Sequence, residues 1–420
     1  MTARTGPVPA VGTGAGTDGA AGGAADAGAA LGCRLVTDAA GLAALGPAWE
    51  ALEAADPECT PFNAFRWNEA WWERYGTPGA LRVVVVERAG WVVGIAPFHL
   101  VREPALRVLR TRAVRFVGSG GDTSPDYLGV LAEGRGAARE AIVARAVDEL
   151  LRMPGWGTAN LRDVRRGSAL DRILAERLAR APGTVRPVAA KRVLVADLPG
   201  TWDEFRASLS TKRRKQLNHR RNRLERAGEA RLSIADGAEA RKRAMDALIR
   251  LHRLRWSTKD DPGKFRSDAY VDFHRAVVER FAARDELWLV TLELDGVIIG
   301  VLYLFRWRDE LLFFQSGFDP AHEALSPGHV MFGWTYREAI RRGLRRADLL
   351  KGEYHYKEAW ARDETFLHDH LFHRPGPLAW LARARARVRA RGAAEPASGP
   401  RPESPGPRAG RPDTESHDGR

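Results

Sequence analysis

The sequence predicts an α/β (α+β) protein made of two tandem copies of one fold, each a mixed, twisted sheet flanked by helices. Three observations carry this prediction. The stretch 286–351 has the order strand, strand, strand, helix, strand. Two pairs of apolar runs match each other at a constant offset of 206 residues (293 − 87). The chain has 420 residues, which is enough for two domains of ordinary size.

The predicted order of elements is clearest in the second copy. Asp295-Gly296 lies between two β-branched and apolar runs and supplies the positive φ angles of a type I′ hairpin turn. A third run, 311–318, is followed by Ser326-Pro327-Gly328, where Ser can cap a helix and Pro suits the first helical position. That helix leads to a last strand over 347–351.

The internal repeat sets the domain organisation. We expect a first domain over 32–190 and a second over 191–375, joined between 185 and 202. Residues 1–31 are predicted to form a disordered tail, and residues 376–420 a basic helical extension and a second disordered tail, because their composition cannot bury enough apolar surface. The matched positions of the repeat are Glu87, Gly90 and Gly94 with Glu293, Gly296 and Gly300.

The first copy differs from the second after its third run. An aromatic stripe that includes Trp67 and Trp71 is predicted to be core. The Gly-rich loop 118–127 follows, without a Ser-Pro-Gly helix entry. We interpret it as a loop of the cleft between the domains, with Asp126 and Tyr127 as candidate substrate contacts; a polar turn with no such role is the alternative.

Three short segments carry a family resemblance. They are Leu325-Ser326-Pro327-Gly328-His329, Gly352-Glu353-Tyr354-His355-Tyr356-Lys357-Glu358-Ala359-Trp360 and Lys212-Arg213-Arg214-Lys215. With these motifs, the stretch 286–360 resembles the acyl-CoA-binding half of the GNAT superfamily of N-acyltransferases. The chain from about 35 to 374 is similar to the group typified by the CelD cellulose-biosynthesis proteins, and also to the Fem-type aminoacyl transferases, which carry two such folds. The GNAT pyrophosphate loop has further glycines, of which this sequence keeps Gly328.

The resemblance implies acetyl-CoA or another acyl-CoA as cosubstrate, held where the strands 311–318 and 347–351 splay apart. The thioester would lie near Gln315, Ser316 and Gly317, and the pyrophosphate at the backbone of Ser326, Gly328, His329 and Val330.

Acyl transfer to an amine also needs a base and an acid for the leaving thiolate. Ionisable groups gather in 352–357, just after the last predicted strand. Glu353 is the candidate base, Tyr356 the candidate acid, and Lys357 a candidate ligand for a substrate carboxylate or phosphate. Alternatively, Tyr356 and Lys357 form a structural latch.

The basic helix that Ser210 is predicted to cap also has two interpretations. It is either a solvated face, or a site for the 3′-phosphate of CoA, a tRNA backbone or an acidic glycan. The net charge of +13 fits either one.

A metal site is not expected. His368, His370 and His373 share a strand face, yet no acidic or cysteine partner stands at a familiar spacing. The only cysteines, Cys33 and Cys59, have no metal-like spacing and fit a reducing cytoplasm, with a disulfide between them as the alternative.

The sequence lacks a secretory signal and an apolar stretch long enough to span a bilayer, which favours a cytoplasmic location. We therefore expect a cytoplasmic N-acyltransferase acting on a small amine, such as a sugar or a cell-envelope precursor, in the cleft between the domains. DNA is not an expected partner. The alternatives are a Fem-type transferase that uses aminoacyl-tRNA, and a non-catalytic polyanion-binding module.

Overall fold

The computed structural model describes residues 30–104, 110–185, 189–256, 263–352, 357–376 and 380. Most of the two predicted tails lies outside these ranges. The elements of the first half are β1 (Leu31–Val36), α1 (Ala39–Ala44), α2 (Gly46–Ala55), η1 (Pro61–Asn63), α3 (Phe65–Tyr75), β2 (Leu81–Arg88), β3 (Trp91–Pro104), β4 (Arg110–Phe116), β5 (Leu131–Ala132), α4 (Gly136–Arg152), β6 (Thr158–Arg165), α5 (Ala169–Arg180), β7 (Thr184–Val185) and β8 (Ala189–Asp197).

Two helices connect this half to the second. They are α6 (Trp202–Ser208) and α7 (Thr211–Ala227). The second half then contains β9 (Ala230–Ile234), α8 (Ala238–Trp256), η2 (Lys264–Arg266), α9 (Asp268–Ala282), β10 (Leu287–Leu294), β11 (Val297–Trp307), β12 (Glu310–Phe318), η3 (Pro320–Leu325), α10 (Pro327–Arg341), β13 (Arg346–Lys351), η4 (Lys357–Ala359) and β14 (Asp363–His373). The mixed α/β fold class and the strand, strand, strand, helix, strand order of 286–351 are confirmed.

The two halves repeat one another in detail. The hairpins β2–β3 and β10–β11 each contain a β-bulge, between Val86 and Glu87 in one and between Leu292 and Glu293 in the other, so the offset of 206 residues holds for the bulges as well. Both hairpin turns have two residues of positive φ, Ala89-Gly90 and Asp295-Gly296. The repeat predicted from the sequence is therefore present in the backbone.

The same repeat explains two glycines. A methyl group on Gly94 would meet Ile142 Cγ2 of α4 at 2.5 Å, and one on Gly300 would meet Met331 Sδ of α10 at 2.6 Å. In each half, the glycine lets the following helix pack directly on the hairpin.

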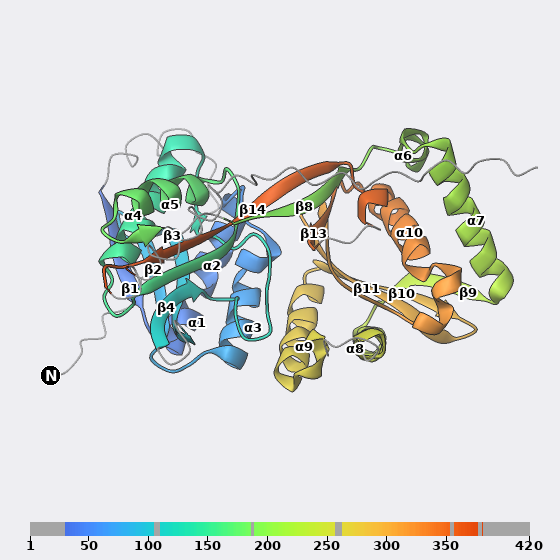
Figure 1. Cartoon of the computed structure of the whole chain (residues 1–420), viewed down its shortest axis with the longest axis horizontal. Coiled ribbons are helices and arrows are strands. Elements are labelled where there is room, and N and C mark those ends of the chain that lie inside the picture. The colour runs from blue at the N-terminus through green and yellow to red at the C-terminus, as the bar shows by residue number, and fades with distance from the viewer. Residues whose placement is uncertain are drawn as a thin grey trace, which may run out of the picture.

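All the described strands belong to a single 14-stranded sheet, because the two halves exchange strands. The order along the sheet is β1-β2-β3-β4-β6-β14-β8-β13-β12-β11-β10-β9. β14, from the end of the chain, pairs with β6 of the first half, whereas β8, from the first half, pairs with β13. Figure 1 shows β14 and β8 side by side between the two halves. The hydrophobic pattern alone did not predict this exchange.

Helices cover both faces of the second half's sheet. On one face, α8 and α9 share a core with residues such as Tyr303, and this core continues into the first half. On the other face, α6, α7 and α10 pack over residues such as Leu302. The predicted aromatic stripe is core: Trp67 and Trp71 are buried, and the Trp67 ring lies 5.0 Å from the Phe273 ring of α9. Aromatic packing therefore joins α3 to α9 across the halves.

Two sequence-based interpretations are corrected. Ser326 adopts a left-handed conformation (φ 55°, ψ 51°), and its side chain does not cap α10. Its hydroxyl instead accepts a hydrogen bond from Arg223 Nη2 at 3.1 Å. Cys33 and Cys59 are free thiols, so the alternative of a disulfide between them is wrong. In contrast, Ser210 does cap the basic helix α7, accepting from the Arg213 N–H.

Candidate active site

The parallel strands β12 and β13 separate partway along their length. They pair at Glu310–Arg346, Leu311–Ala347 and Leu312–Asp348, and β12 then continues to Phe318 without β13. Leu350 has a positive φ of 53°, and the pairing of β13 with β8 shifts over the same stretch. The end of β13 thus turns away, and backbone that a neighbouring strand would use is left open, as the resemblance implied.

A cavity of about 460 Å³ lies at this opening. Both halves contribute to its wall, since the loop 118–127 of the first half meets β12, β13 and the end of α8 there. The lining residues are Asp122, Ser124, Asp126, His252, Arg255, Gly263, Arg266, Leu302, Phe313, Phe314, Gln315, Ser316, Phe332, Leu350, Lys351, Gly352 and Lys357.

The three residues expected near a thioester take different positions. Gln315 and Ser316 line the cavity, and Gln315 Nε2 lies 3.4 Å from the hydroxyl of Tyr270, to which it donates. Gly317 is instead buried beneath α8, where a Cβ would approach Leu251 Cβ to 3.1 Å. Gly317 therefore serves the packing of α8 on β12.

Asp126 lies in the cavity wall as a fixed carboxylate. It accepts from the Lys351 backbone N–H at 2.5 Å, and its Oδ1 lies 3.0 Å from Lys351 Nζ. Burial raises the pKa of Asp126, and the Lys351 ammonium opposes that rise. Lys351 also pairs with Asp163, which pairs in turn with Lys191. These charges link the first half's loop to the end of β13.

Tyr127 is not among the residues that line this cavity. Its hydroxyl donates to Asp348 Oδ2 at 2.6 Å, and both residues are buried. Burial raises the pKa of Asp348 to about 6, while the hydrogen bond from Tyr127 opposes that rise. This places Tyr127, which the sequence suggested as a substrate contact, in the connection between the two halves.

Lys357 supports the irregular end of β13. Its Nζ donates to the backbone carbonyls of Leu349, Leu350 and Lys351 at 2.7, 3.0 and 3.1 Å. Burial lowers its pKa to about 8, so the ammonium form still predominates at neutral pH. One buried cation thus holds the backbone of three residues that lie beyond the last pair between β12 and β13.

The candidate base Glu353 and the candidate acid Tyr356 lie outside the described residues. The chain enters that segment from Gly352 and leaves it at Lys357, and both of these residues line the cavity.

The start of α10 offers few backbone donors. Pro327 has no N–H, and the N–H groups of His329 and Val330 already donate to the Ser326 carbonyl. A Cβ on Gly328 would meet no atom within 4 Å, so this glycine borders open space. Trp360 Nε1 donates to His329 Nδ1 at 3.3 Å, and burial, together with Arg220, lowers the pKa of His329 to about 4. His329 is therefore neutral, so any positive charge that binds a phosphate at the start of α10 must come from another element.

That charge comes from α7, which lies beside the start of α10. An open groove of about 770 Å³ between them is lined by Thr211, Lys212, Lys215, Gln216, His219, Arg220, Arg223 and Ser326. Within the described ranges, no carboxylate forms an ion pair with Lys212, Lys215, Arg220 or Arg223. Burial lowers the pKa of Arg220, and the positive charge of nearby Arg223 lowers it further. Such a groove suits a polyanion.

The fold and the opened sheet together give the chain a tandem, GNAT-like α/β architecture. Residues 211–358 match the family model described as "Acetyltransferase (GNAT) domain". This match spans β12, α10 and β13, the elements that form the opening. Among curated proteins, none matches the sequence significantly.

Several solved structures are similar to this chain at low sequence identity. The crystal structure of FemX is similar over 80% of this chain and 96% of its own, with 11% identity and a TM-score of 0.53. A conserved protein of unknown function from Bacteroides thetaiotaomicron covers 81% of this chain and 100% of its own, with 10% identity and a TM-score of 0.49. A tandem GNAT protein from the clavulanic acid biosynthesis pathway covers 83% and 100%, with 14% identity and a TM-score of 0.41.

No helix of the described chain is long and apolar enough to cross a bilayer.

Sequence reasoning missed several residues that shape the site. Asp348 and Lys351 are in the predicted last strand but were not singled out, and Asp163 and Lys191 come from distant strands. A charged residue within an otherwise apolar strand, such as Asp348, is the one signal that could have found this network.

Proposed function

We propose that the chain transfers an acyl group from acyl-CoA to an amine in the cavity between its two halves. The observation that carries this proposal is the opening between β12 and β13 at Leu312–Asp348, which faces a cavity of about 460 Å³. An extended pantetheine arm can pair with the backbone that β12 leaves unpaired there. Gln315 and Ser316 then lie beside the thioester carbonyl, and direct attack needs only that both reactants be held in line.

The donor's phosphates would bind in the groove between α7 and α10. Gly328 leaves room for close approach, and Arg220 and Arg223 provide the charge that the α10 backbone does not. α10 connects the two places, because Ser326 lines the groove and Phe332 lines the cavity.

Within this proposal, Glu353 is the base, directly or through a water, and Tyr356 protonates the leaving thiolate. Asp126 is placed to meet the acceptor, since it lines the cavity from the first half. The three carbonyl bonds of Lys357 favour the latch interpretation over a direct substrate contact.

A thiol-release assay tests the proposal. The full chain is mixed with acetyl-CoA and a panel of amines that includes amino sugars and amino acids, and free CoA thiol is measured. We expect one class of amine to raise the rate of thiol release. Tyr356→Phe and Glu353→Gln are each expected to lower kcat at least tenfold, whereas the matched control Tyr354→Phe is expected to keep a kcat near that of the wild type. Full activity in both site variants would contradict the catalytic assignment.

The second candidate is transfer from aminoacyl-tRNA. The observation that favours it is the size of the groove, about 770 Å³, together with two further cations, Lys212 and Lys215, near the start of α7. Charged tRNA as donor in the same assay, without any thiol release from acetyl-CoA, would support this candidate. Tight polyanion binding with neither transfer reaction would support the binding module instead.

The finer assignments also belong to this proposal. Either donor is a cytoplasmic molecule, which agrees with the proposed location, and the likeness to the CelD group points to a sugar or cell-envelope amine as acceptor.

A further inference from the structure

Two histidines of β14 meet an aspartate of α5 away from the cavity. His368 Nδ1 lies 2.9 Å from Asp171 Oδ1, and His370 Nε2 lies 2.8 Å from the same oxygen. The three ligand atoms all lie within 4.8 Å of one another. Alternation along β14 places both imidazoles on one face of the sheet, and α5 brings the carboxylate over that face.

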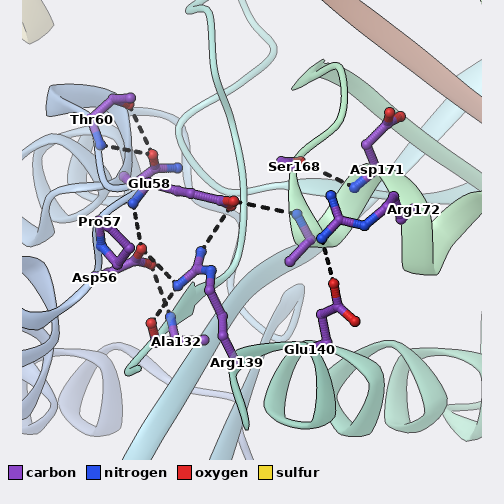
Figure 2. Close-up of polar contacts among 12 residues, drawn as sticks. Asp56, Pro57, Glu58, Thr60, Ala132, Arg139, Glu140, Ser168, Asp171 and Arg172 are labelled. Carbon is purple, nitrogen blue, oxygen red and sulfur yellow. Dashed lines mark hydrogen bonds and ion pairs between the residues drawn. The ribbon is translucent and has the colours of Figure 1, made fainter. Parts of the chain in front are cut away.

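The aspartate is held in position independently of the histidines. Ser168 caps α5 by accepting from the Asp171 N–H, and the Gly167 N–H donates to Asp171 Oδ2 at 2.8 Å. The second oxygen is therefore fixed, and Oδ1 faces the two rings. Figure 2 shows Asp171 at the start of its helix, with the Ser168 contact drawn.

The surroundings suit a cation. His370 is buried, whereas 19% of the His368 side chain is exposed, which gives an ion access from one side. Two arginines at the end of β6 are engaged elsewhere: Arg165 lies over the Tyr127 ring at 4.2 Å and Arg166 over the Phe366 ring at 5.5 Å. Positive charge is thus not directed at the cluster.

The distances fit a zinc ion after a small adjustment. Zinc binds imidazole nitrogen and carboxylate oxygen at about 2.0–2.2 Å, so in a tetrahedral site two ligand atoms lie about 3.3 Å apart. The present oxygen–nitrogen separations of 2.8 and 2.9 Å need to open by about half an ångström, and the two imidazole nitrogens, which lie within 4.8 Å of each other, need to approach to about 3.3 Å. Each ring must carry its proton on the nitrogen that faces away from the ion, and a water completes four ligands.

We propose that Asp171, His368 and His370 bind Zn²⁺, and that the ion fastens β14 to α5. Asp171 and His368 are 197 residues apart in the chain. β14, which carries His368, comes from the second half and pairs with β6 in the sheet of the first half. The ion therefore ties the exchanged strand to the first half. His373, the third histidine of the strand, bonds to Thr158 at 3.0 Å and lies outside the site.

The test uses the full chain without a histidine tag, freed of metal by a chelator. ZnCl₂ is titrated by calorimetry, and the unfolding temperature is measured with and without Zn²⁺. We expect one ion per chain and a higher unfolding temperature with zinc. His368→Ala is expected to weaken zinc binding at least a hundredfold, and the control His373→Ala to bind as the wild type does.

A second variant separates metal binding from folding. Asp171→Asn keeps the size of the side chain and an oxygen for hydrogen bonds, so it is expected to unfold near the metal-free wild type and to gain no stability from zinc. Co²⁺ in place of Zn²⁺ is expected to give the intense visible bands of a four-coordinate site. The proposal is overturned if the wild type binds no zinc, or if His373→Ala loses as much affinity as His368→Ala.

Discussion

Tyr127→Phe tests the buried contact that joins the two halves beside the cavity. The change removes the 2.6 Å hydrogen bond from the Tyr127 hydroxyl to Asp348. A hydrogen bond to a charged group contributes about 1.5–3 kcal/mol, so at pH 8, where Asp348 is ionised, we expect a loss of about 2 kcal/mol in the free energy of unfolding. Below the Asp348 pKa of about 6 the acceptor is neutral, and we expect about 1 kcal/mol at pH 5.

The pKa of Asp348 also predicts how the wild type responds to pH. Its value of about 6 is raised from the ordinary 3.8, mainly by burial, with Asp126 adding to the rise and Arg165 opposing it. The folded state therefore binds the proton more tightly than the unfolded state. The stabilisation is complete below about pH 4 and is lost as the pH rises through 6, by about 3 kcal/mol for this group.

Urea unfolding of the wild type and the variant at pH 5 and pH 8 measures both effects. The matched control is Tyr336→Phe, whose hydroxyl donates to the neutral carbonyl of Trp360 at 3.2 Å. That variant is expected to lose about 1 kcal/mol at either pH. An equal loss for Tyr127→Phe at the two pH values would refute the assignment of Asp348 as its charged partner.

The remaining predictions concern packing and the end of β13. Gly94→Ala is expected to destabilise the fold by about 2 kcal/mol and Gly300→Ala by less, because the new methyl group meets the stiff side chain of Ile142 in the first half and the flexible side chain of Met331 in the second. Urea unfolding measures the stability of both variants. A larger loss for Gly300→Ala than for Gly94→Ala would contradict the packing argument. Lys357→Met leaves three backbone carbonyls without their cation and is expected to lower the free energy of unfolding by about 2–4 kcal/mol. Lys357→Arg keeps a cation and is expected to restore part of this stability. An unchanged unfolding midpoint in Lys357→Met would exclude the latch role.

Local patterns predicted much of the fold. The Asp295-Gly296 turn and the helix entry at Pro327 each follow from short-range chemistry, and each appears in the structure. The basic helix and its Ser210 cap were likewise evident from the sequence. Such features depend on residues only a few positions apart.

Long-range partners could not be predicted in the same way. An alternating strand such as β14 does not specify which sheet it joins, so its exchange with β8 was missed. The pairing of Asp171 with His368 spans 197 residues. The three carbonyls that bind Lys357 are backbone atoms, which leave no mark in the sequence.

Calorimetric titration of acetyl-CoA tests the donor site most directly. The wild type is compared with Gly328→Trp, which fills the open space at the start of α10, with Arg220→Glu, which reverses a charge in the groove, and with Arg226→Glu, an exposed control on the same helix. The account predicts micromolar binding by the wild type and the control, and at least tenfold weaker binding by the other two. Binding that both groove variants retain, or no binding by the wild type, would contradict it.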